Sequence, residues 1–197
     1  MGKIVLLMGK STTGKDTIYK ELLERNTLDL KKVVIYTTRP MRDNEQNGVQ
    51  YYFCDEEGYQ KFLNDRKIIE GRTYDTCYGP WRYFTVDDGQ IDLDEGSSLM
   101  IGTIEAYESM VEYFGQDKVV PVYIEISDRL RMERAMHREN KQEHPKYDEM
   151  CRRFLADEED FSEDKIKAAG IKRRFNNEGA IDQVLDDITE YLKAEGV

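Results

Sequence analysis

Short apolar runs alternate with stretches of helical periodicity along most of the chain. The apolar runs lie at 4–8, 33–36, 98–101 and 119–126. Apolar residues recur at three- and four-residue spacing at 16–25, 104–114, 128–139 and 180–193. Strands that alternate with helices in this way predict a layered α/β domain with a mainly parallel sheet.

Two segments depart from the alternation and divide the expected domain. The stretch from about 37 to 90 is rich in Tyr, Thr, Gly and Phe, with strand-like pieces near 50–53, 68–74 and 82–86. We expect it to form a small β-rich insertion. We expect a single domain over 1–197, with a core made of 1–36, 91–127 and 166–197.

The second segment, about 128–165, consists mostly of helix formers and charged residues, and Pro145 interrupts it. A segment so poor in large apolar residues predicts a helical lid. Its acidic run, Asp157 to Asp160, is interpreted as a solvated helix face rather than a metal site. His137 and His144 are likewise expected to be solvated.

A glycine-rich turn follows the first apolar run and precedes the first helical stretch. It reads Gly9-Lys10-Ser11-Thr12-Thr13-Gly14-Lys15-Asp16-Thr17. The spacing Gly-x-x-x-x-Gly-Lys between a strand and a helix is typical of a loop whose backbone N–H groups surround a phosphate. We therefore predict that all nine residues bind ATP, with Lys15 on the outer phosphates.

The metal position of this loop is unusual. Asp16 stands where a Ser or Thr hydroxyl commonly meets magnesium, and the hydroxyl of Thr17 comes one residue later. A carboxylate is a hard oxygen ligand suited to Mg²⁺, although an acidic residue in the first helical turn also favours the helix dipole. Asp16 and Thr17 are the predicted magnesium ligands.

Composition limits the partners. The chain has 35% charged residues and a formal net charge of −11, which disfavours a nucleic-acid partner. Its three cysteines lack the paired spacing of a zinc site and fit a reducing cytoplasm. Neither a secretory signal nor a membrane span is expected. We expect small-molecule nucleotides as ligands and a monomer or homodimer.

Other phosphate-loop classes need features that are missing here. A GTPase would pair an Asp-x-x-Gly switch with an Asn-Lys-x-Asp base reader, and the base reader does not occur. An ATPase motor would end a second apolar strand in an acidic residue, whereas 98–101 is followed by Gly102. Small-molecule kinases remain as the main class.

The segment Tyr36-Thr37-Thr38-Arg39-Pro40-Met41-Arg42, followed by Glu45, Gly48, Tyr51 and Phe53, resembles the acceptor-phosphate segment of the guanylate kinase family. Two arginines three residues apart and a phenol form a charge-assisted clamp for a monophosphate. The resemblance is strong over 3–53 and looser beyond. It continues through Tyr78-Gly79, Arg134, Arg138, Arg152-Arg153-Phe154 and Phe175-Asn176-Asn177.

The resemblance implies magnesium-dependent phosphoryl transfer from ATP to a nucleoside monophosphate, with GMP or dGMP as the family default. Catalysis in such a scheme consists of positioning and charge neutralisation. The implied catalytic residues are Lys15, Arg39, Arg134, Arg138 and Arg153. The implied acceptor-binding residues are Arg39, Arg42, Tyr51, Glu70 and Tyr78.

This chain departs from the family where guanine is read. Pro80 follows the Tyr-Gly pair in place of a hydroxyl, Gly102-Thr103-Ile104 replaces an Asp-x-Asp strand end, and Ile35 replaces a serine. Two alternatives therefore stay open. One is a kinase for a different phosphorylated acceptor, with Tyr74, Asp75, Trp81 and Tyr83 available to line its pocket. The other is a non-catalytic guanylate kinase-like binding module.

Overall fold

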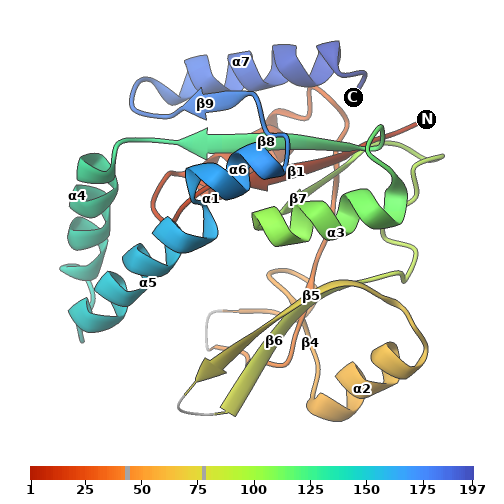
Figure 1. The fold of residues 1–197 in the computed structure, drawn as a ribbon, viewed down its shortest axis with the longest axis horizontal. Helices are drawn as coiled ribbons and strands as arrows, with labels where there is room; N and C mark the ends of the chain where they lie inside the picture. The colour runs from red at the N-terminus through yellow and green to blue at the C-terminus, as the bar shows by residue number, and fades with distance from the viewer. Residues whose placement is uncertain (43–44, 77–78) are drawn as a thin grey trace.

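A five-stranded parallel sheet lies between two layers of helices in the computed structural model, which describes residues 1–42, 45–76 and 79–197 (Figure 1). The strand order is β2 (Lys31–Lys32), β7 (Ser98–Ile101), β1 (Ile4–Met8), β8 (Val119–Glu125) and β9 (Arg174–Asn176). The structure confirms the α/β class and the mainly parallel sheet. The predicted strand at 33–36 is wrong in its bounds, because pairing with β7 is confined to Lys31–Lys32 and the chain re-enters a strand at Tyr36.

Strand β1 is the centre of the core, and all five of its residues are buried. Its side chains alternate between the two faces of the sheet. Ile4, Leu6 and Met8 pack with helix α3 (Ile104–Phe114) on one face. Val5 and Leu7 pack on the other face with α1 (Lys15–Arg25) and α7 (Ile181–Ala194). Both faces being apolar explains why the run shows no alternation in sequence.

A second sheet lies below the first in Figure 1 and is built from the predicted β-rich insertion. Its strand order is β4 (Tyr52–Phe53), β3 (Tyr36–Thr37), β6 (Gly79–Val86) and β5 (Ile68–Thr76). It also carries helix α2 (Glu56–Asn64), which the sequence analysis did not predict. Asp55 caps that helix at the Gly58 amide, and Tyr59 and Phe62 pack their rings against Phe84.

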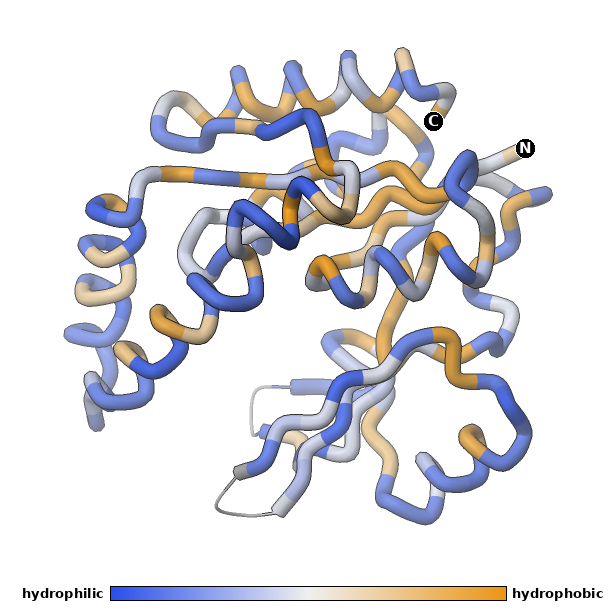
Figure 2. The backbone as a smooth tube through the Cα atoms, viewed as in Figure 1, coloured by the Kyte–Doolittle hydropathy of each residue, from blue (hydrophilic) through white to orange (hydrophobic). Residues whose placement is uncertain are grey.

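The segment predicted as a lid contains two complete helices and the start of a third. Helix α4 (Asp128–Glu139) and helix α5 (Tyr147–Asp160) pack against each other, and α6 (Glu163–Ala168) leads back to the core. The break predicted at Pro145 lies between α4 and α5. Figure 2 shows mostly hydrophilic residues along α4 and hydrophobic ones along the central strands. Within the described parts of the chain, no helix has the length and apolar character to cross a bilayer.

Candidate active site

The carboxyl edge of the parallel sheet collects the chemistry-bearing segments. Strand β1 runs into the phosphate loop (residues 9–14), β7 into the N-cap of α3 at Thr103, and β8 into α4. Strand β9 ends next to Asn177. Parallel strands place their carboxyl ends at one edge, and ligands of open α/β sheets bind there. Residues far apart in the sequence therefore share one site.

The phosphate loop is held in shape by its neighbours. Asn177 is buried, and its Nδ2 donates to the Thr13 carbonyl at 2.8 Å. Gly14 has φ of +91°, and a Cβ there would collide with that same Asn177 amide. Arg134 donates from Nη2 to the Asn177 carbonyl at 3.1 Å. The loop conformation thus requires glycine at 14 and is supported by the C-terminal segment.

The start of α1 carries the remaining residues predicted to bind ATP and magnesium. Gly14 is its N-cap with no side-chain hydrogen bond, so the first amides of the helix are free to meet an anion. Asp16 and Thr17 are exposed in the first turn, and Lys15 has no hydrogen-bond or ion-pair partner among the described residues. These groups fit ATP with Mg²⁺, because magnesium takes one or two protein oxygens beside substrate phosphates. Among the described residues, no group of three or more His, Cys, Asp or Glu side chains is placed to hold a metal ion.

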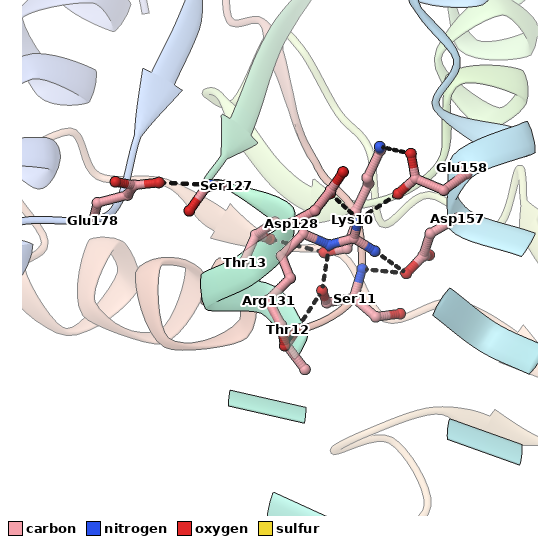
Figure 3. Close-up of polar contacts among 10 residues, drawn as sticks. All are labelled: Lys10, Ser11, Thr12, Thr13, Ser127, Asp128, Arg131, Asp157, Glu158 and Glu178. Carbon is pink, nitrogen blue, oxygen red and sulfur yellow. Dashed lines mark hydrogen bonds and ion pairs between the residues drawn. The ribbon is translucent and has the colours of Figure 1, made fainter. Parts of the chain in front are cut away.

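The acidic run of α5 differs from the prediction. Asp157 and Glu158, called here the acid pair, face the phosphate loop instead of solvent (Figure 3). Asp160 is also only partly exposed, and Glu159 alone of the four is exposed. The reason is electrostatic: Lys10 and Arg131 present positive charge to this face of the helix. His137 and His144 are exposed, as predicted.

Arg39 is the centre of the predicted acceptor clamp, which comprises Arg39, Arg42 and Tyr51. Its side chain is 4% exposed and forms two parallel bonds to Glu45, of 2.7 and 2.9 Å. Its guanidinium also lies over the rings of Tyr51 and Phe53. Hydrogen bonding to Arg39 holds the pKa of the Glu45 carboxyl below its usual range. The pair fixes the guanidinium in one orientation.

The other clamp residues lie nearby. The Arg42 side chain is exposed, while its backbone amide donates to Glu45 at 2.9 Å. Burial raises the pKa of Tyr51, which keeps its phenol protonated and able to donate a hydrogen bond at neutral pH. Tyr78, the fourth predicted phosphate contact, lies outside the described residues.

A cavity of about 280 Å³ opens between the insertion, the core and the lid. Its lining comprises Gly71, Arg72, Thr73, Tyr74, Thr103, Glu105 and Asp160. Tyr83 connects it to the clamp, because its ring lies 5.6 Å from both Tyr74 and Tyr51. Burial raises the pKa of Asp160, and the neighbouring carboxylates of Glu105 and Asp157 raise it further. Of the four residues that the sequence offered for a new pocket, Tyr74 lines this cavity directly.

Glu70 stands behind this cavity. It is 4% exposed, its Oε1 accepts from Thr85 at 2.8 Å, and its Oε2 lies 3.6 Å from Arg72 Nε. Neither Glu70 Oε2 nor Arg72 Nε has a hydrogen-bond partner within the described part of the chain. Glu70 therefore faces Arg72, and Arg72 faces the cavity. Sequence reasoning missed Arg72 and Glu105, because an isolated charge in a strand or first helical turn is ordinarily a solvated residue.

The three predicted lid arginines occupy different environments. Arg134 supports the phosphate loop from behind, through Asn177 and the Thr13 carbonyl. Arg138 is exposed in the last turn of α4. Arg153 is exposed on α5, with Nε 4.0 Å from Glu149. The structure therefore brings Arg134 to the loop and leaves Arg138 and Arg153 on the lid surface.

The strand, glycine loop, lysine and parallel sheet define a P-loop protein of the α/β class. Residues 1–84 match the family model described as guanylate kinase. The chain is 26% identical over 140 residues to the guanylate kinase of Campylobacter jejuni strain RM1221, covering 71% of this chain and 66% of that one. It is 40% identical over 79 residues to the guanylate kinase of Mycoplasma mobile, covering 40% of this chain and 39% of that one.

Among solved structures, that of the guanylate kinase from Anaplasma phagocytophilum is similar, with a TM-score of 0.67 and 22% identity. It covers 98% of this chain and 86% of that one. The chain spans less than two thirds of the length of the curated relatives it matches. The first 84 residues thus match the guanylate kinase family model, and the whole chain has a fold similar to that of a guanylate kinase.

Proposed function

We propose that this protein transfers a phosphoryl group from ATP to a nucleoside monophosphate, with GMP or dGMP as the first acceptors to test. The observation that carries the proposal is the cavity bounded by core, insertion and lid. On α5, Asp160 at this cavity lies one helical turn from Asp157 at the phosphate loop. Donor loop and acceptor pocket are thus neighbours.

In this proposal each part neutralises one anion. The loop amides and Lys15 bind the donor phosphates, while Arg39, Arg42 and Tyr51 bind the acceptor phosphate. Asp16 and Thr17 would hold magnesium, which supplies charge neutralisation of the transferred phosphoryl group. Arg138 and Arg153 are exposed, and the one ion pair that Arg153 forms among the described residues is long, 4.0 Å to Glu149, so both could turn toward the bound phosphates. No strong base is needed, because the acceptor phosphate is already an anion.

The acceptor's base would bind in the cavity. Arg72 donates there, and Glu105, Asp160 and Thr103 offer oxygen acceptors. A base edge that carries a hydrogen-bond acceptor beside a hydrogen-bond donor would pair with both Arg72 and the oxygen groups. The Watson–Crick edge of guanine is such an edge. We propose that Arg72 takes over contacts that Pro80 and Gly102 cannot make. A different phosphorylated acceptor remains the alternative within the same class.

The test is a coupled assay of ADP release with ATP and Mg²⁺ across GMP, dGMP, IMP, AMP, CMP and UMP. We expect ADP release that depends on the acceptor for at least one of these nucleotides. The others should give lower kcat/KM, because their bases fit the cavity less well. The Arg39→Ala variant should lose that release, while exposed Arg66→Ala should retain it. If no acceptor elicits release while phosphopeptides bind tightly, the chain is a binding module and the proposal is wrong.

A further inference from the structure

Helix α5 sets two carboxylates against groups that should bind phosphate. Asp157 Oδ2 accepts from the Ser11 backbone N–H at 2.8 Å. Glu158 Oε2 pairs with Lys10 Nζ at 2.6 Å. Both partners lie within the phosphate loop, whose amides and lysines are the donors that an anion requires. The acid pair therefore occupies part of the loop's capacity to bind anions, as Figure 3 shows.

Arg131 fixes the acid pair in this position. Its side chain is 1% exposed, and its Nη2 lies 3.0 Å from Asp157 and its Nη1 2.5 Å from Glu158. The same guanidinium donates from Nε to the Ser11 carbonyl at 3.3 Å and stacks over Phe154. A buried arginine with this many partners has one well-defined place. Loop, α4 and α5 are thus joined through one side chain.

The balance of charge in this network is unfavourable for a polyphosphate. Asp128, Asp157 and Glu158 contribute three negative charges against two positive ones from Lys10 and Arg131. A triphosphate placed on the loop would meet carboxylates at hydrogen-bond range of its own binding groups. Like charges at such separations repel strongly in a partly buried site.

We propose that the acid pair is an internal competitor of the nucleotide: a polyphosphate binds the loop only by displacing Asp157 and Glu158 from Ser11 and Lys10. This inference rests on the proposed donor role of the loop. Binding and the position of α5 are then linked, so each shifts the other by the same factor. The carboxylates lower donor affinity and couple it to lid movement, because the same helix carries Arg153 and borders the acceptor cavity through Asp160.

The test measures binding of MgATP and of inorganic tripolyphosphate by calorimetry to the full chain. The variants are Asp157→Asn and Glu158→Gln, which keep side-chain size and remove one charge each. We expect each to bind both probes on the order of tenfold more tightly, because a charge-assisted competitor becomes a neutral one. The matched control is Glu159→Gln, on the same helix with the same change of charge but exposed to solvent. Its affinity should stay close to wild type.

A second measurement follows the helix itself. Hydrogen exchange of residues 147–160 should become faster when MgATP binds to the wild-type chain, and the change should be smaller in Asp157→Asn. Thermal unfolding of each variant verifies that Arg131 is still held by its remaining partners.

Three results would overturn the proposal that the acid pair competes with the nucleotide. They are unchanged or weaker binding in both variants, an equal gain in the Glu159→Gln control, and exchange in α5 that ignores MgATP. The proposed transfer reaction fails separately, if the variants bind MgATP more tightly yet no acceptor gives ADP release. If no protein in the series binds either probe, the loop is not a donor site and the competitor is also wrong.

Discussion

The phosphate loop and the predicted acceptor clamp both hold their positive groups against carboxylates, but the carboxylates come from different parts of the chain. Glu45 lies six residues from Arg39, within the same connection of the insertion. Asp157 and Glu158 lie 146 and 148 residues from their loop partners, on a helix of the lid. A local carboxylate moves with the group it orients, whereas a distant one ties that group to another part of the fold.

Because of this difference in sequence separation, the Arg39–Glu45 pair and the contacts of the acid pair have different roles. Glu45 bonds Arg39 through both oxygens, and both side chains are well buried, so this contact stays in place and orients the guanidinium. The acid pair bonds the loop through one oxygen on each partner, and Glu158 is 39% exposed. This contact can open by a shift of one helix. The Arg39–Glu45 contact therefore stays within the insertion, whereas the contacts of the acid pair depend on the position of α5.

The largest expected effect is on stability at the donor side. Arg131→Met leaves Asp157 and Glu158 without their main partner, so unfolding free energy should fall by about 3–5 kcal/mol, as when one member of a buried ion pair is removed. Denaturant titration measures the loss. Arg129→Met, two residues away on the same helix and 87% exposed, should cost almost nothing. Equal stability of the two variants would contradict the anchoring role of Arg131.

The next effect is on turnover. Lys15→Ala should lower kcat for ADP release by on the order of 10²–10³, because one positioned cation on the transferred group is lost. Its melting temperature should not change, since Lys15 has no partner among the described residues. Lys20→Ala, exposed on the same helix and paired with Glu24, provides the matched control. A Lys15 variant with wild-type kcat would exclude the loop as the donor site.

A smaller effect is expected in the acceptor cavity. Arg72→Lys keeps the charge but loses the planar fork, and should raise the acceptor KM roughly tenfold with little change in kcat. Arg82→Lys, on the neighbouring strand and paired with Glu56, should leave KM unchanged. Steady-state kinetics with the preferred acceptor separates the two variants. Loss of kcat at constant KM would instead place Arg72 outside base recognition.

The smallest effect concerns Glu45 and pH. The pKa of Glu45 is lowered by its bonds to Arg39, so its contribution to stability is present above the usual value of 4.5 and is lost as pH falls through the lowered pKa. Glu45→Gln should therefore cost about 1 kcal/mol at pH 7 and progressively less in acid. Unfolding measured from pH 7 to pH 3 checks this. Exposed Glu143→Gln should show no such convergence with wild type.

The elements with strong local patterns could be predicted from sequence. Helices 104–114 and 128–139 have the predicted bounds, and β1 was evident because both of its faces are apolar. Helix α2 was missed because its packing partner, Phe84, belongs to a strand more than twenty residues further on. Its capping residue, Asp55, was the local signal that could have located it.

Some residues of the candidate site could likewise be predicted from the sequence, and others could not. The phosphate loop and the Arg39 segment are contiguous motifs, so their residue types are visible in the chain. The acid pair and Arg131 acquire their roles only from partners that the fold brings together, and Arg72 acquires its role from a cavity that distant segments complete. An acidic run on a helix is ordinarily solvated, and nothing local distinguishes Asp157 from Glu159. What distinguishes them is which side of α5 meets the loop.

The support of the phosphate loop by Asn177 has a consequence for the order of synthesis. Within this sequence the loop comes before Ser98 and Val119, where the strands that flank β1 begin, and before residue 177, whose amide holds Thr13. A nascent chain therefore carries the nucleotide motif long before it has a nucleotide site. Contacts of such long range form late in folding. The loop therefore reaches the conformation seen here only after residue 177 has been made and has packed against Thr13.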